Sequence, residues 1–196
     1  MTDLESWVAT TYTGLADLLA RAPAECWDSG SLCESWQIRH VVAHVTMPVR
    51  LTPEQFGAEM AAVDGDFTVL SNTVAARDAA LPIADHLANL RSPLLHAWQP
   101  HGGGAAGALS HAVIHSLDVT VPLDLLPVAP PEAVAAVLDQ LTSANGAWFG
   151  LDLTEVGLEA TDTDWRWGSG EVTRTDSGRL VALLSGRTLP DGRTLR

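Results

Sequence analysis

Four of the seven histidines form two pairs whose members stand four residues apart. His40 and His44 make the first pair, and His111 and His115 make the second. In an α-helix, residues four apart lie on the same face one turn from each other, so both imidazoles of a pair can bind one metal ion. Two such pairs on separate helices favour a divalent metal site inside a helical bundle, where facing helices commonly supply the ligands.

The apolar sequence around these histidines supports the metal hypothesis. His44 stands among valines and an alanine, and residues 108–117 around His111 and His115 are mostly apolar. A buried imidazole without a partner loses its solvation. The alternative is a core histidine that hydrogen-bonds to a carbonyl oxygen. A metal held by His44, His111 and His115 would satisfy all three rings and leave a fourth coordination position open, as in catalytic sites.

Further polar residues are candidates for catalysis or for substrate binding. Asp118 lies three residues after His115, where it can accept a hydrogen bond from the second ring nitrogen of that ligand, or be a solvated residue near the helix end. Asp118 and His40 are the nearest candidates for a catalytic base. Arg166 and Arg187 are candidates for binding a substrate carboxylate, and solvated surface arginines are the alternative.

The segments that must position these residues are helical up to about residue 150. Apolar residues three and four apart predict a first helix over residues 2–21. Similar patterns, interrupted by glycine and proline, predict helices over 36–49, 53–65, 67–79, 83–98, 105–121 and 131–145. Ser35 is the expected N-cap of the second helix, and Thr52 is the expected N-cap of the third, before Pro53.

The pattern changes near residue 150. Short alternating segments at 156–160, 165–167 and 171–174, separated by turn sequences, predict strands. A helix is expected over 177–185 and a last strand over 189–195. Trp165 and Trp167 alternate with Arg166, which places both indoles on one face of a strand. The sequence predicts a mainly α protein, with a helical domain over residues 1–150 and a small α/β domain over residues 151–196.

Charge and cysteine content exclude several classes of protein. The chain has 24 acidic residues and 11 basic residues, all of them arginine, for a net charge of -13. Such a chain repels phosphate groups, which argues against nucleic-acid binding and against docking on anionic membranes. The acidic first residues, the lack of a long apolar run and a cysteine count too low for a disulfide framework predict a cytoplasmic protein. We expect a monomer or a homodimer. Cys33 has no basic neighbour in sequence that would activate it, which favours a small buried or boundary thiol over a nucleophile.

Two stretches resemble a known family. Residues 33–45, CESWQIRHVVAHV, are similar to the Trp-x-Val-Arg-Asp-x-x-Ala-His-Leu signature of the DinB-like superfamily. Within it, residues 111–118, HAVIHSLD, resemble the second metal motif of the mycothiol-dependent maleylpyruvate isomerases and related mycothiol S-transferases. Residues 158–165 and 183–187 are similar to the small α/β domain that follows the bundle in this branch.

The resemblance implies a four-helix bundle that holds a divalent metal, usually zinc, through His44, His111 and His115. In that branch the metal activates mycothiol, or a similar low-molecular-weight thiol, for attack on a small electrophile. Two positions depart from the pattern. His40 stands where the family usually has Asp and can compete as a ligand or support one. His111 stands at a position where the resemblance implies a Glu in the isomerase itself. This difference weakens the expectation of the particular isomerase reaction.

The first hypothesis is therefore a metal-dependent thiol transferase or isomerase that uses mycothiol on a small electrophile. A metal-dependent hydrolase is the second hypothesis, and thiol dependence of turnover separates the two. A non-catalytic DinB-like protein that binds a metal or a small ligand is the third. It would differ from an enzyme in lacking an exchangeable coordination position on the metal.

Overall fold

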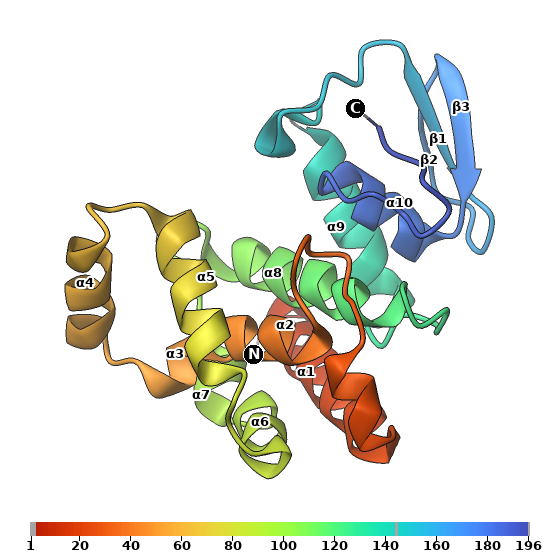
Figure 1. Ribbon diagram of the computed structural model, residues 1–196. Helices are drawn as coiled ribbons and strands as arrows, with labels where there is room; N and C mark the ends of the chain where they lie inside the picture. The colour runs from red at the N-terminus through yellow and green to blue at the C-terminus, as the bar shows by residue number, and fades with distance from the viewer. Residues whose placement is uncertain (1–2, 144, 196) are drawn as a thin grey trace.

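The computed structural model describes residues 3–143 and 145–195, and its fold is mainly helical with a small three-stranded sheet near the C-terminal end (Figure 1). The predicted fold class is confirmed. The helices before the sheet are α1 (Asp3–Arg21), α2 (Ile38–Val45), α3 (Met47–Arg50), α4 (Pro53–Ala62), α5 (Phe67–Asp78), α6 (Ile83–Leu90), α7 (Pro93–Ala97), α8 (Gly104–Thr120) and α9 (Pro131–Ser143). Two short 3₁₀ helices, η1 (Ala24–Asp28) and η2 (Ala147–Phe149), lie in the connections.

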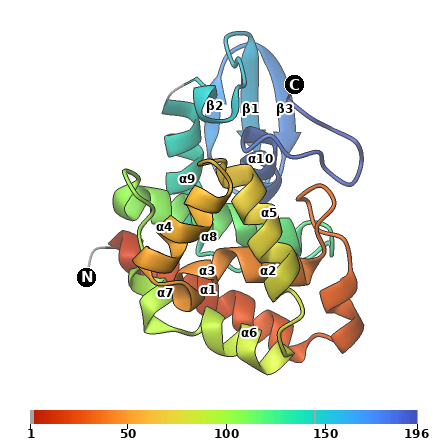
Figure 2. The ribbon, with the colours of Figure 1, turned by 60° about the vertical axis from the view of Figure 1, so that its left-hand side comes forward.

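Helix α8 is the centre of the helical part, as both ribbon views show (Figures 1 and 2). It packs against α1, α2 and α9, and α2 also packs against α5. Ala112, Val113 and Leu117 of α8 are at most 1% exposed. A helix that is apolar on nearly all sides is stable only when other helices cover it. Any polar side chain on α8 is therefore placed inside the protein.

Two predicted helices are divided in the structure. The segment 36–49 forms α2 and α3, which meet at Thr46, because Pro48 has no N–H to continue the hydrogen bonds of α2. Ser35 is not the N-cap: it has a φ of 65°, and Gln37 is the N-cap instead. The segment 83–98 likewise divides into α6 and α7 before Pro93.

The predicted N-cap of α4 is confirmed. The Thr52 hydroxyl accepts a hydrogen bond from the Gln55 N–H at 3.2 Å, and the Gln55 side chain accepts one from the Thr52 N–H at 2.9 Å. This reciprocal arrangement satisfies two N–H groups that the first turn of a helix leaves without partners.

The sheet has the strand order β2-β1-β3 and consists of β1 (Val156–Ala160), β2 (Arg166–Gly168) and β3 (Glu171–Thr175). Strand β1 is antiparallel to β2 and parallel to β3. The turn between β2 and β3 must therefore cross the end of β1. Only glycine fits there, because a Cβ on Gly168 would lie 2.1 Å from the Val156 carbonyl oxygen.

Helix α10 (Ser177–Leu184) follows the sheet and packs against α9, α8 and β1. The apolar core is continuous across this contact: Leu138 of α9, Leu158 of β1 and Leu180 of α10 are members of one buried cluster. The secondary structure changes from helices to strands near residue 150, as predicted, but the two parts share one apolar core. No helix in the described ranges is long and apolar enough to cross a membrane.

The predicted last strand over residues 189–195 is wrong. Within this segment the Leu189 N–H donates to the Arg193 carbonyl at 3.0 Å, and the Gly192 N–H donates to the Leu189 carbonyl at 2.8 Å. Pro190 has no N–H for a strand ladder, and the Asp191-Gly192 turn folds the chain back on itself. The segment therefore closes a local turn instead of joining the sheet.

Candidate metal centre

Three of the predicted ligands come together between α2 and α8. One ring nitrogen from each of His44, His111 and His115 lies within 4.8 Å of the others. The centroids of the three rings are 4.7 to 5.4 Å apart. His111 and His115 share one face of α8 because they are four residues apart, and the packing of α2 on α8 brings His44 to the same place.

Each of these three histidines has its Nδ1 atom in a hydrogen bond with an oxygen of another side chain. The pairs are His44 with Ser71 (2.9 Å), His111 with Tyr12 (2.9 Å) and His115 with Asp118 (2.8 Å). Within residues 3–143 and 145–195, no hydrogen bond engages the Nε2 atoms of these rings. With Nδ1 occupied, Nε2 is the nitrogen that each ring offers to a metal. Three imidazoles oriented in this way fit the donor set that zinc prefers.

Burial keeps two of the ligands in the form that binds metals. Loss of solvation lowers the pKa of His44 to about 3, and it lowers the pKa of His111 well below its usual value. The charge of neighbouring His115 acts in the same direction. Both rings are therefore neutral at pH 7, as metal ligation requires.

Asp118 is the most connected residue of the site. Its carboxylate is 1% exposed and accepts hydrogen bonds from Arg187 Nε at 2.8 Å and from Arg187 Nη2 at 2.9 Å. The thiol of Cys33 also donates to it, at 3.0 Å. Burial alone would raise the pKa of Asp118, but the hydrogen bonds from Arg187 and His115 outweigh burial and hold that pKa below its usual range. Because a carboxylate can only accept, His115 carries its proton on Nδ1.

The same contacts show the state of Cys33. Burial, followed by the charge of Asp118, raises the pKa of this thiol. Cys33 is therefore a protonated hydrogen-bond donor at neutral pH, as expected of a small boundary thiol.

The remaining predicted site residues lie in different places. Arg187 is at the site, but its guanidinium forms an ion pair with Asp118. Arg166 is an exposed residue of β2 and is not among the partners of the three histidines. His40 lies one turn before His44. Its Nδ1 accepts a hydrogen bond from the backbone N–H of Gln37 at 3.2 Å, and this bond caps the N-terminal end of α2. Neither Arg166 nor His40 joins the histidine group formed by the described residues.

Tyr12 and Ser71, which hold two of the ligand rings, were missed by sequence reasoning. Ser71 gives no signal, because serine is common on helices of every kind. Tyr12 gives a weak signal: it is the single tyrosine of the chain and stands in the apolar stripe of α1, where a buried hydroxyl needs a partner.

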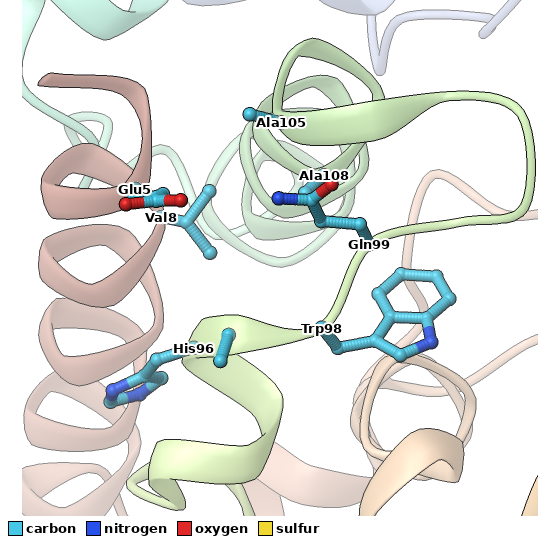
Figure 3. Close-up of a pocket in the computed structure, with 8 residues that line it drawn as sticks. Glu5, Val8, His96, Trp98, Gln99, Ala105 and Ala108 are labelled. Carbon is cyan, nitrogen blue, oxygen red and sulfur yellow. The ribbon is translucent and has the colours of Figure 1, made fainter. Parts of the chain in front are cut away.

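Aromatic side chains surround the histidines. The ring of Trp36 lies 5.2 Å from that of His44, Phe67 lies 6.4 Å from His44, and Trp98 lies 5.2 Å from His111. Figure 3 shows a small cavity beside Trp98, between α1, α7 and α8. Its volume of about 10 Å³ has room for no more than one water molecule, so it is no substrate site.

Comparison with known proteins identifies similar chains. The family model described as mycothiol maleylpyruvate isomerase N-terminal domain matches residues 8–121, which include the three histidines and Asp118. A solved structure of a histidine-to-alanine mutant of the mycothiol-dependent maleylpyruvate isomerase is 16% identical, with a TM-score of 0.55. A structure of the mycothiol-dependent maleylpyruvate isomerase is 14% identical, with a TM-score of 0.52. Each likeness covers 98% of this chain and 93% of the other, and at these identities it shows a shared fold. No curated protein matches by sequence.

Proposed function

The chain belongs to the mycothiol maleylpyruvate isomerase N-terminal domain family, and from this premise we propose that it is a metal-dependent enzyme acting with a low-molecular-weight thiol. Mycothiol is the proposed thiol, and a small electrophile is the proposed second substrate. The observation that carries the proposal is the set of three imidazoles from α2 and α8, each held through Nδ1 with Nε2 left for a metal.

His44, His111 and His115 would hold the ion, and zinc suits these ligands best. A divalent ion at this position would lower the pKa of a bound thiol and keep the sulfur as a nucleophilic thiolate. Three neutral imidazoles leave the full 2+ charge of the ion in place, which favours a thiolate more than a site with a carboxylate ligand would. Ser71, Tyr12 and Asp118 fix the orientation of the three rings.

In this proposal Asp118 positions His115 and does not transfer a proton. Its two oxygens already accept four hydrogen bonds, from His115, Cys33 and two nitrogens of Arg187. Protonation of Asp118 would break the ion pair with Arg187 in a buried setting. The thiol proton therefore passes to solvent water. His40 caps α2 and has no part in the reaction.

The thiolate sulfur attacks an electrophilic carbon of the second substrate and forms a carbon–sulfur bond. In a transfer reaction, the leaving group departs with its electron pair, or the carbon next to the new bond takes a proton from water. In an isomerisation, the electron pair of the double bond moves onto the conjugated part of the substrate as sulfur adds. The resulting carbon–carbon single bond then rotates, and the thiolate leaves with the electrons of the carbon–sulfur bond as the double bond returns.

The test is thiol dependence of turnover. The zinc-loaded protein is assayed for conversion of a panel of electrophiles with mycothiol and without it. We expect the electrophile to be converted only when mycothiol is present, and we expect His115→Ala to lose this activity. The control His101→Ala should keep it, because His101 is exposed and outside the histidine group. Turnover that does not need a thiol would favour the hydrolase. Metal bound without turnover and without thiol binding would favour a non-catalytic binding protein.

A further inference from the structure

Three aromatic rings lie next to the candidate metal site. Trp36 and Phe67 contact His44, and Trp98 contacts His111. Phe67 is 50% exposed, and both tryptophans are half-buried. The indole N–H of Trp36 donates to Asn72 at 3.0 Å, so its polar atom is already engaged. A molecule that reaches the histidines therefore meets ring faces and ring edges.

Among the residues that the structure describes, the two arginines that act on His44 are already paired with carboxylates. The chain has no lysine. The guanidinium groups that act on His44 are those of Arg187 and Arg50. Arg187 binds both oxygens of Asp118. Arg50 binds Asp78 at 2.8 Å through Nη2, and its Nε also binds Asp78 at 2.9 Å. Each guanidinium charge is already balanced by a buried carboxylate, so a substrate carboxylate would meet no unpaired cation at either group.

These two observations point to the chemistry of the second substrate. We propose that the electrophile is an uncharged planar or aromatic molecule held by Trp36, Phe67 and Trp98, and that carboxylate-bearing acids are poor substrates. The inference deepens the proposed function and rests on it. Aromatic rings stabilise a flat apolar ligand by stacking and by burial of its surface. A carboxylate at the same place would lose its solvation without gaining a free cation, in a protein whose net charge of -13 repels anions.

The binding preference is measured with unreactive probes. Dinitrobenzamide and dinitrobenzoate have the same ring and nearly the same shape, and they differ by one negative charge. Each is titrated into the zinc-loaded protein by calorimetry in the presence of mycothiol, so that the benzoate does not gain by ligating the metal. We expect the amide to bind about tenfold or more tightly than the benzoate. Equal affinity, tighter binding of the benzoate, or no binding of either probe would overturn the inference.

Substitutions of the aromatic residues test whether these rings bind the uncharged probe. Trp98→Ala and Phe67→Ala should each weaken binding of the amide about tenfold with zinc content unchanged, which a general loss of folding would not give. Trp148→Ala is the matched control, because Trp148 is 69% exposed and has no ring contact with the histidines. If both ring variants bind the amide like the parent, the rings do not form the site.

A second pair of probes keeps the inference apart from the proposed function. Chlorodinitrobenzamide and chlorodinitrobenzoate react with a thiolate: the carbon–sulfur bond forms, the carbon–chlorine bond breaks, chloride leaves with its electron pair and the thiol proton goes to water. Mycothiol-dependent acceleration, corrected for the uncatalysed rate, should favour the amide. If neither compound is accelerated and mycothiol does not bind, the proposed function fails. The titration on metal-free protein still decides the binding preference, because the rings and the paired arginines remain.

Discussion

Arg187 and Asp118 form a two-point ion pair that joins the segment after α10 to the end of α8. The Nε–Oδ1 distance is 2.8 Å and the Nη2–Oδ2 distance is 2.9 Å. The carboxylate is 1% exposed, the guanidinium side chain is 21% exposed, and the same carboxylate also holds Nδ1 of His115. The C-terminal part of the chain thus supports a candidate metal ligand through one buried carboxylate.

Removal of Arg187 should destabilise the protein strongly. In Arg187→Met the buried charge of Asp118 loses its partner, which typically costs about 3–5 kcal/mol. The double variant Asp118→Asn with Arg187→Met should lose less than Arg187→Met alone, because no unpaired charge remains. Chemical denaturation of the parent, Arg187→Met and the double variant measures the free energy of unfolding. As a control, Arg166→Met should change it by less than about 0.5 kcal/mol, since that arginine is exposed on β2. A small effect of Arg187→Met would mean that the pair contributes little.

The parts of the fold that depend on local pattern were predictable. The spacing of apolar residues located the helices, and the spacing of His111 and His115 predicted that they share a face of α8. Prolines mislead in two ways. Pro48 divides one expected helix, and Pro190 with Gly192 turns an expected strand into a closed turn. In both cases the missing N–H of proline outweighs the apolar pattern.

The contacts around the ligands were only partly predictable. Asp118 is three residues from His115, so the hydrogen bond between them follows from helix geometry. Tyr12 and Ser71 come from α1 and α5, and their positions depend on how whole helices pack. Arg187 was a candidate for substrate binding, but the sequence does not reveal that a buried carboxylate already occupies it.

Loss of a ligand should abolish metal binding. His115→Ala should lose stoichiometric zinc, and His44→Ala and His111→Ala should bind it at least about 100-fold more weakly, because two imidazoles cannot complete the ligand set. Elemental analysis and competition with a chelator measure both effects. The control His40→Ala should keep its zinc, since His40 caps α2. Full zinc content in all three ligand variants would mean that the metal is bound elsewhere.

The partners of the ligands should tune the affinity for zinc. Tyr12→Phe and Ser71→Ala each remove the oxygen that holds Nδ1 of a ligand. We expect affinity to fall about 10- to 100-fold in each variant, because the freed ring loses its fixed tautomer and orientation. Thr10→Val is a matched control, since Thr10 is exposed on α1 and its hydroxyl donates to a helix carbonyl. Unchanged affinity in both partner variants would show that packing alone holds the rings.

His86 should make stability depend on pH independently of the metal site. It is 1% exposed and stacks on Trp27, with ring centroids 5.5 Å apart. Burial lowers its pKa. Arg50 and Arg39 act in the same direction, and they outweigh the opposite effects of the Ala79 carbonyl and of Asp78. The folded pKa is thus below the unfolded value of about 6.5.

The sign of the effect follows from proton binding. As pH falls below about 6.5, the unfolded chain takes up a proton at residue 86 before the folded chain does, so stability falls by up to about 1.4 kcal/mol per pH unit from this one group. Above that pH the contribution is complete and constant. His86→Phe keeps a ring against Trp27 and removes the titration, so the parent should lose more stability than the variant between about pH 7.5 and pH 5.5. Denaturation at both pH values measures the difference, with His101→Phe as the exposed control. Equal losses in parent and His86→Phe would show that His86 does not contribute.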